Sequence, residues 1–89
     1  MTCKIQRQVI GTDLVVLRVS GRLTGEHVDT LRALFEEERS SALILDLKEV
    51  RLVDEEVVKL LAVHEANGTK ITNCPRYIRE WIKGEREAT

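Results

Sequence analysis

Aromatic residues are scarce in this chain: Phe35, Tyr77 and Trp81 make up 3% of it. Single-stranded nucleic acids are usually held by aromatic rings on which the bases stack, so this scarcity argues against that class of ligand. The chain also lacks an excess of positive charge, because 14 basic and 15 acidic residues leave a formal net charge of -1. Without a positive field, phosphate backbones are not attracted. We therefore expect no nucleic-acid binding.

Long apolar runs are also missing. No stretch approaches the roughly 18 apolar residues that a membrane-spanning helix needs. The first seven residues, Met1 to Arg7, alternate between apolar and polar types and lack the apolar centre of a secretion signal. We expect no membrane insertion and a cytoplasmic location.

Cysteine and histidine are sparse. Cys3 and Cys74 are the two cysteines, and His27 and His64 are the two histidines. In the cytoplasm two thiols are expected to stay reduced, and the four residues show no zinc-ligand spacing. We expect no disulfide, no metal site and no cofactor. His64 completes a helical apolar stripe, and we expect it to pack at the edge of a helix face.

The remaining composition is that of a folded domain. The chain has 89 residues, of which 43% are hydrophobic and 33% are charged. This length supports one core, and the apolar share is too high for a disordered segment. We expect a single domain covering residues 1–89.

The spacing of apolar residues predicts seven elements in the order strand, strand, helix, strand, helix, strand, helix. This order predicts an α/β fold: a four-stranded mixed sheet with its helices packed mainly on one face. The predicted elements are strands at 4–10 and 14–20, a helix carrying Val28, Leu31, Leu34 and Phe35, a strand at 42–47, a helix after Asp54, a strand at 70–72 and a helix opened by Pro75.

Several details follow from the same patterns. Residues 21–25 are interpreted as a turn and residues 48–52 as a connector. The run 42–47 has no polar alternation and predicts an interior strand buried on both faces. The acidic residues 36–38 are interpreted as a solvated helix end that frays near 40–41. Residues 84–89 form a charged tail that is a candidate for disorder.

The final helix carries its own apolar set. Tyr77, Ile78, Trp81 and Ile82 are spaced as one docking face.

Two segments resemble a known family. Leu45 to Leu61 reads as a buried strand ending in Asp-Leu, a short connector and a helix opened by Asp54. This segment resembles the STAS domain of sulfate transporters and anti-sigma factor antagonists, in which an apolar-Asp-Ser-Ser-Gly signature opens a helix. Val19 to Thr24 is similar to the family's Gly-x-Leu-Asp element, with Thr24 in place of Asp. The resemblance extends from Val9 to Ile82 and implies a non-catalytic, regulatory protein-interaction module of bacterial character.

The signature itself differs in this chain. In anti-sigma factor antagonists the first Ser accepts phosphate from a partner kinase, which releases or blocks that partner. Here Glu55 and Glu56 replace the two serines and Val57 replaces the glycine. Two interpretations stay open: Glu55 imitates part of the charge of a phosphoserine, or both acids simply complement the helix dipole.

The resemblance implies a partner-binding site at Asp54, Glu55, Glu56, Val57 and Thr24. The partner would be an anti-sigma factor-like kinase or a transporter subunit. A self-associating scaffold, or homodimer, is the alternative, formed through the strand at 3–10 or the helix that carries Trp81. An enzyme is not expected, because no nucleophile elbow, Cys/His pair or convergent acid pair has a recognisable spacing.

Two remaining groups have ordinary interpretations. Asp46 and Asp54 bracket the predicted connector, and we interpret them as a strand-end acid and a helix cap. Cys74 precedes a helix start, where a lowered thiol pKa is one alternative and a small buried residue is the other.

Overall fold

The computed structural model describes residues 3–38 and 42–87 of the chain. The elements are β1 (Cys3–Ile10), β2 (Leu14–Leu23), the 3₁₀ turn η1 (Gly25–His27), α1 (Val28–Glu37), β3 (Ala42–Val53), α2 (Glu55–Ala66), β4 (Lys70–Thr72) and α3 (Arg76–Glu87). None of the helices among these residues is long and apolar enough to cross a membrane.

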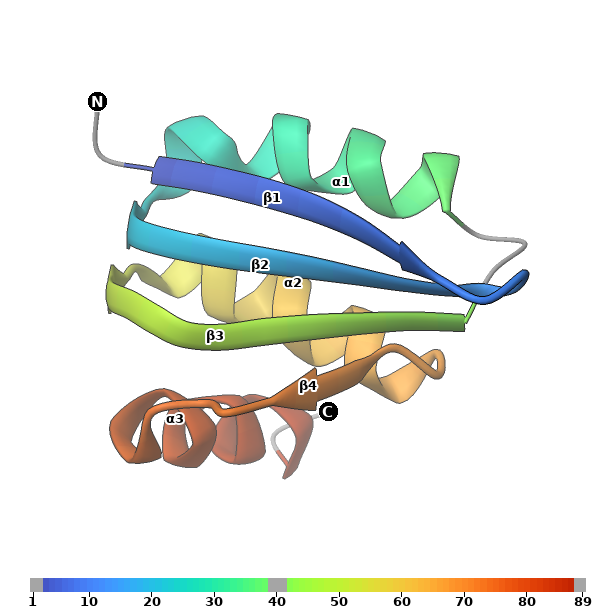
Figure 1. The fold of residues 1–89 in the computed structure, drawn as a ribbon. Coiled ribbons are helices and arrows are strands. Elements are labelled where there is room, and N and C mark those ends of the chain that lie inside the picture. The colour runs from blue at the N-terminus through green and yellow to red at the C-terminus, as the bar shows by residue number, and fades with distance from the viewer. Residues whose placement is uncertain (1–2, 39–41, 88–89) are drawn as a thin grey trace.

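The four strands form one mixed sheet in the order β1-β2-β3-β4. β1 and β2 are an antiparallel hairpin, and its turn contains Gly11 at a φ of 69°, a conformation that suits glycine. β2, β3 and β4 run parallel, so each connection must cross the sheet through a helix. α1 and α2 lie behind the sheet and α3 lies beyond β4 (Figure 1). The predicted fold class and element order are confirmed.

The core lies between the sheet and the helices. Alternate residues of β2, namely Val15, Leu17 and Val19, are buried on the helix side. β3 contributes Leu43, Leu45 and Leu47 in the same way, while Ile44 and Asp46 are half-buried on the other face. The prediction of a β3 strand buried on both faces is therefore wrong, since the helices cover one face only.

Both strands of the central pair are longer than predicted. Residues 21–23 continue β2 and residues 48–52 continue β3, so the expected turn and connector are extended strands. The register shifts twice along this pair, and Gly21 takes a φ of 93° between the shifts. These irregularities place Val50 and Val53 in the core. Because of these irregularities, apolar residues do not alternate with period two in residues 21–23 and 48–52, and the sequence pattern did not indicate a strand there.

The acidic end of α1 is partly structural. Glu38 is 8% exposed and accepts a hydrogen bond of 2.7 Å from Nε of Arg7 in β1. The bond raises the pKa of Arg7. Interpreting the whole run 36–38 as solvated was therefore wrong for Glu38. The fraying expected near 40–41 lies outside the described residues.

α3 buries only half of its predicted docking face. Ile78 and Ile82 are fully buried, whereas Tyr77 is 49% exposed and Trp81 is 37% exposed. Neighbouring positions are about 100° apart around a helix, so the isoleucine stripe turns the two aromatic rings outward. The helix continues to Glu87, and residues 84–87 of the expected tail are therefore helical. Residues 88–89 lie outside the described residues.

Candidate protein-interaction site

Three helix starts gather at one end of the molecule. β2, β3 and β4 are parallel, and their carboxyl ends lie at the same edge of the sheet. Each strand leads directly into a helical segment, so η1 with α1, α2 and α3 all begin there (Figure 1). Helix starts carry unpaired N–H groups and partial positive charge. This edge is where the residues predicted from the family resemblance come together.

Asp54 ties two of these connections to each other. Its Oδ1 accepts a hydrogen bond of 3.1 Å from the backbone N–H of Val57, which caps α2 as predicted. Its Oδ2 accepts a 2.6 Å bond from the N–H of Gly25, the residue that follows Thr24 at the end of β2. The backbone N–H of Asp54 in turn donates to the carbonyl of Leu23. Asp54 is thus a structural clamp between segments 29 residues apart.

Thr24 is held within the same turn. Its backbone N–H donates to Nδ1 of His27 at 3.2 Å, and the N–H of His27 donates to the carbonyl of Thr24 at 2.9 Å. A methyl group added to Gly25 would lie 2.7 Å from Oε2 of Glu56, so the Thr24 turn and the start of α2 are in close contact. The structure therefore brings Thr24 beside the α2 residues.

Glu55 and Glu56 occupy the first turn of α2, and both are exposed. The side chain of Glu55 is 67% exposed and lies 3.9 Å from Nζ of Lys59, one turn further along the helix. At this exposure the pair contributes little to stability, about 0.3–0.5 kcal/mol. The Glu55 carboxylate is accessible to a partner.

Val57 does not belong to the surface. Its side chain is fully buried in the core, and its N–H is the group that Asp54 caps. The resemblance implied that Val57 belongs to the partner-binding site, and its burial leaves the side chain no surface to offer a partner. The sequence carried the signal, because Val57 begins the apolar stripe that continues with Leu60 and Leu61.

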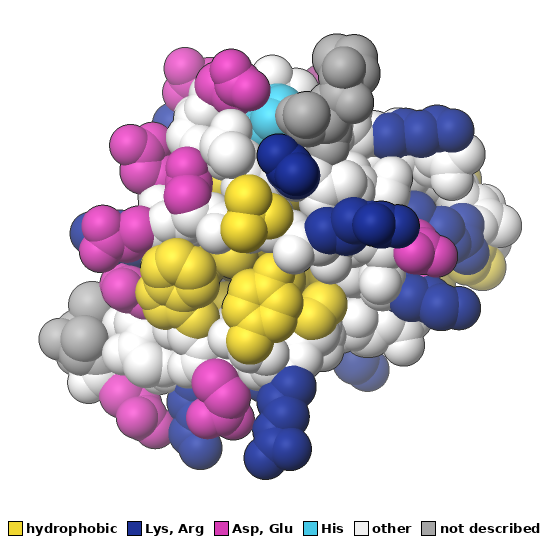
Figure 2. Space-filling model, turned by 90° about the vertical axis from the view of Figure 1, so that its left-hand side faces the viewer, with side chains coloured by type: hydrophobic (Ala, Val, Ile, Leu, Met, Phe, Trp, Pro, Cys, Tyr) yellow, Lys and Arg dark blue, Asp and Glu magenta, His cyan; other side chains and the backbone are white. Residues whose placement is uncertain are grey.

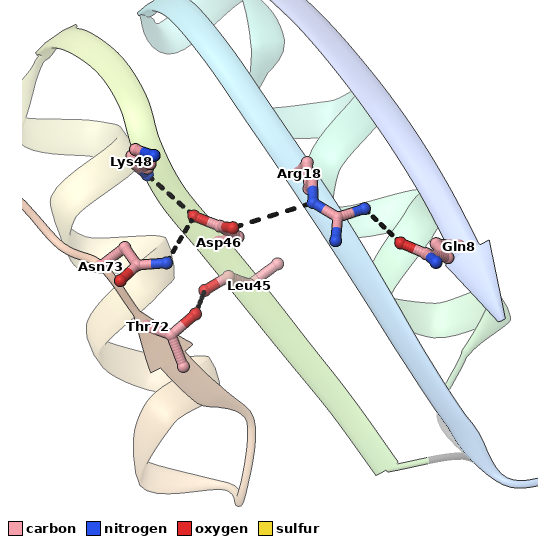
Figure 3. Close-up of polar contacts among 7 residues, drawn as sticks. All are labelled: Gln8, Arg18, Leu45, Asp46, Lys48, Thr72 and Asn73. Atoms are coloured by element: carbon pink, nitrogen blue, oxygen red, sulfur yellow. Dashed lines mark hydrogen bonds and ion pairs between the residues drawn. The ribbon is translucent and has the colours of Figure 1, made fainter. Parts of the chain in front are cut away.

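The uncovered face of the sheet carries a line of polar contacts (Figure 3). Asp46 accepts hydrogen bonds from the N–H of Lys48 at 3.0 Å and from Nδ2 of Asn73 at 3.2 Å, and it lies 3.9 Å from Nε of Arg18. Arg18 also donates to Gln8 on the next strand. Asp54 follows Asp46 by eight positions, with seven residues of β3 between them, which is roughly 25 Å of strand, so the two acids form no pair. Within this line of contacts, the positive charge of Arg18 and the negative charge of Asp46 offset each other.

His64 and the cysteines have structural surroundings. The His64 ring packs against Phe35 with 4.3 Å between ring centroids, which confirms its predicted place at a helix edge. Burial raises the pKa of the Cys74 thiol, which agrees with the interpretation of a small, partly buried residue. Among residues 3–38 and 42–87, no group of three or more His, Cys, Asp or Glu side chains is placed to hold a metal ion.

The comparison that decides the fold is with a solved structure. The anti-sigma factor antagonist SpoIIAA, in its unphosphorylated form, matches this structure with a TM-score of 0.70 at 19% sequence identity. The match covers 94% of this chain and 84% of that chain. The chain has the STAS fold. No protein-family model and no curated protein matches the sequence.

Proposed function

We propose that this STAS-fold chain is a regulatory protein-interaction module whose partner binds at the start of α2. The binding residues are Asp54, Glu55 and Glu56 together with the adjoining Thr24 turn. The observation that carries the proposal is that the neighbouring acids at the start of the helix have different surroundings. Asp54 makes the structural bonds, whereas Glu55 points a 67% exposed carboxylate outward.

The chemistry of this site is that of a fixed charge. A Glu carboxylate carries one negative charge, against roughly 1.5 to 2 for a phosphorylated serine, and it cannot be removed by a phosphatase. A partner that recognises the Glu55 position therefore meets a constant signal. We infer that regulation acts through the amount or the competing partners of this protein, and not through phosphorylation of the α2 start.

The fold neighbour suggests the class of partner. SpoIIAA is an anti-sigma factor antagonist, and this chain shares its fold. An anti-sigma factor-like kinase is therefore one candidate partner, and a transporter subunit is the other. We favour a cytoplasmic protein as the partner over a nucleic acid, since the formal charge of -1 supplies no attraction to phosphates.

Affinity capture from the native lysate tests the proposal. The bait variants are wild type, the double substitution Glu55→Ser with Glu56→Ser, and a matched control in which the adjacent acids Glu36 and Glu37 become Ser. Glu36 and Glu37 end α1, at the other end of the helix layer from the start of α2. We expect one captured protein to be lost with the α2 variant and retained with the control.

Two results decide against the proposal. If the same proteins are captured by wild type and by the α2 variant, Glu55 and Glu56 only stabilise the helix. If the control variant loses the partner as well, the effect comes from overall charge and not from the α2 start.

A further inference from the structure

An apolar patch lies beside the proposed binding site. It consists of Leu52, Tyr77 and Trp81, which are 46%, 49% and 37% exposed, and we call it the end patch. The Tyr77 hydroxyl donates a 2.7 Å hydrogen bond to the carbonyl of Arg51, which holds the ring against the end of β3. Trp81 follows Tyr77 by one helical turn and lies on the same side of α3. The three side chains therefore come from two elements but form one surface.

Charges border this surface unequally. Figure 2 views the end of the molecule where the helices begin, and a cluster of hydrophobic side chains lies near its middle. Most of the Asp and Glu side chains lie on one side of the cluster and most of the Lys and Arg side chains on the other, while both signs occur below it (Figure 2). The helices that begin at this end carry acids in their first turns, where the dipole favours them: Glu26, Asp29, Glu55 and Glu56.

The strand ends at this end of the molecule carry basic residues. Arg22 of β2 and Arg51 of β3 are both exposed, and Arg22 is paired in register with Leu52 of the end patch. Acid, apolar surface and base thus follow one another across a single face.

Such a face is complementary to itself. A two-fold axis that lies in the interface and runs perpendicular to the acid-to-base direction places the acidic side of one copy against the basic side of the other. The same operation places the apolar centre against itself, as an isologous dimer requires. We propose that this chain forms a reciprocal homodimer through the end patch, with Trp81 as its central anchor. Tryptophan is enriched among the residues that dominate binding energy at interfaces.

The free edge of the sheet is a weaker candidate for the same role. None of the described strands pairs with the outer side of β1, but β1 carries the exposed cations Lys4 and Arg7. Charged side chains on an edge strand are a known protection against edge-to-edge pairing. The end patch lacks such protection. The charges that border it are acidic on one side and basic on the other, so two copies related by the two-fold axis do not repel each other.

The dimer is independent of the proposed function, since it is measured on the pure protein without a partner. It would cover the start of α2, so dimer and partner complex would compete for the same surface. If dimerisation fails in the pure protein, partner capture can still be measured, and if no partner is captured, dimerisation can still be measured.

Sedimentation velocity across micromolar to millimolar concentrations tests the dimer. We expect a reversible monomer–dimer equilibrium that weakens as salt is added, because the bordering charges are exposed. Trp81 is the only tryptophan, so its fluorescence reports on the patch directly. We expect its emission to shift to longer wavelength when the dimer is diluted. A protein that stays monomeric over the whole range, or a Trp81 emission that does not change between dimer and monomer, overturns the proposal.

Matched variants locate the interface. We expect Leu52→Ser to weaken dimerisation about tenfold, the equivalent of 1.4 kcal/mol. Val63→Ser is the control, because Val63 is 56% exposed on α2 and lies outside the end patch. Equal dimerisation by the two variants contradicts the assignment. Circular dichroism of each variant establishes that it is folded.

A charge-reversal pair tests the geometry without removing apolar surface. One variant carries Glu55→Lys and Glu56→Lys, and the other carries Arg22→Glu and Arg51→Glu. We expect each variant alone to be monomeric, because like charges then face each other, and an equimolar mixture to form a heterodimer. If each variant dimerises as wild type does, or the mixture stays monomeric, the two-fold arrangement is wrong.

Discussion

The carboxylate of Asp54 holds together two connections of the candidate site. Its two oxygens accept from two backbone N–H groups on different connections, at 2.6 Å and 3.1 Å. Helix-capping carboxylates stabilise a protein by about 1 kcal/mol, and the second bond adds a comparable amount. The neighbouring Glu55 makes no contact of this kind among those described, so its exposed carboxylate stays available for the partner binding that we propose.

We expect Asp54→Ala to lower the free energy of unfolding by about 2 kcal/mol, because two backbone N–H groups lose their acceptor. Denaturant unfolding followed by circular dichroism measures this. Glu55→Ala is the matched control, and its cost should stay below about 1 kcal/mol, the range of a dipole interaction. Equal costs for the two variants would mean that the acids share the structural role.

His64 makes stability depend on pH. Burial against Phe35 lowers the pKa of His64, while Glu36 raises it and Arg32 lowers it further. The unfolded chain therefore binds a proton at a higher pH than the folded protein does. We expect the free energy of unfolding to fall as pH drops below 6.5 and to level off below the folded pKa.

Unfolding measured from pH 8 to pH 5, with His64→Leu as the comparison, tests this pH dependence. The variant should lack the part of the slope that wild type shows below its unfolded pKa. An imidazole titration by NMR with a midpoint above 6.5 contradicts the prediction.

The contacts of single residues were partly predictable from the sequence. The cap at Asp54 could be inferred because an acid directly precedes an apolar helical stripe. Its bond to Gly25 could not, since the two residues are 29 positions apart and their meeting depends on strand register. The burial of Glu38 against Arg7 was hidden for the same reason, over 31 positions.

At the scale of elements, α3 is fastened to α2 by apolar contacts and by one carboxylate. Oε1 of Glu65 accepts hydrogen bonds from Arg79 at 2.9 Å and from Arg86 at 3.1 Å. The bond from Arg79 is the main cause that lowers the pKa of Glu65, and Arg86 adds to it. A helix that presents the end patch is therefore oriented in part by these bonds.

We expect Glu65→Gln to lower the free energy of unfolding by about 1 kcal/mol at neutral pH, a value reduced because Arg79 is about one third exposed. A lowered acid pKa gives stability that is present above the unfolded value of 4.5 and is lost as pH falls through the folded value. The difference between wild type and Glu65→Gln should therefore shrink at low pH. A constant difference from pH 7 to pH 3 would exclude this origin.

Element types were predictable where one period dominates. The stripe from Val57 to Leu61 and the sequence Asn67-Gly68 marked both ends of α2, and Gly68 takes the expected positive φ of 110°. The continuation of β2 and β3 through residues 21–23 and 48–52 was not predictable, because register shifts at Gly21 interrupt the alternation. Strand propensity is decided by pairing, which a single segment does not contain.

At the scale of the whole molecule, one face of the sheet is covered and the other is open. The helices and the apolar sides of β2 and β3 close the core, while Arg18 and Asp46 lie on the uncovered side (Figure 3). The sequence could not assign these faces, because Val16 and Ile44 make the open side apolar as well. Which face the crossovers cover follows from the hand of the parallel connections, a property of the assembled chain.

The sheet order also sets the distance between the thiols. Cys3 lies in β1 and Cys74 follows β4, so they belong to opposite edges of the sheet. Both are free, and burial raises the pKa of each thiol. A disulfide requires Cα atoms within about 7 Å, which two intervening strands do not permit.

We expect the folded monomer to form no internal disulfide under mild oxidation. Mass spectrometry of the oxidised monomer should show no loss of two hydrogens, and both thiols should react with a thiol reagent after unfolding. In the folded protein we expect slower reaction than in the unfolded chain at the same pH, since the thiolate fraction falls when the pKa rises. A monomer that lacks two hydrogens would require Cys3 and Cys74 to meet, and would therefore refute the strand order β1-β2-β3-β4 itself.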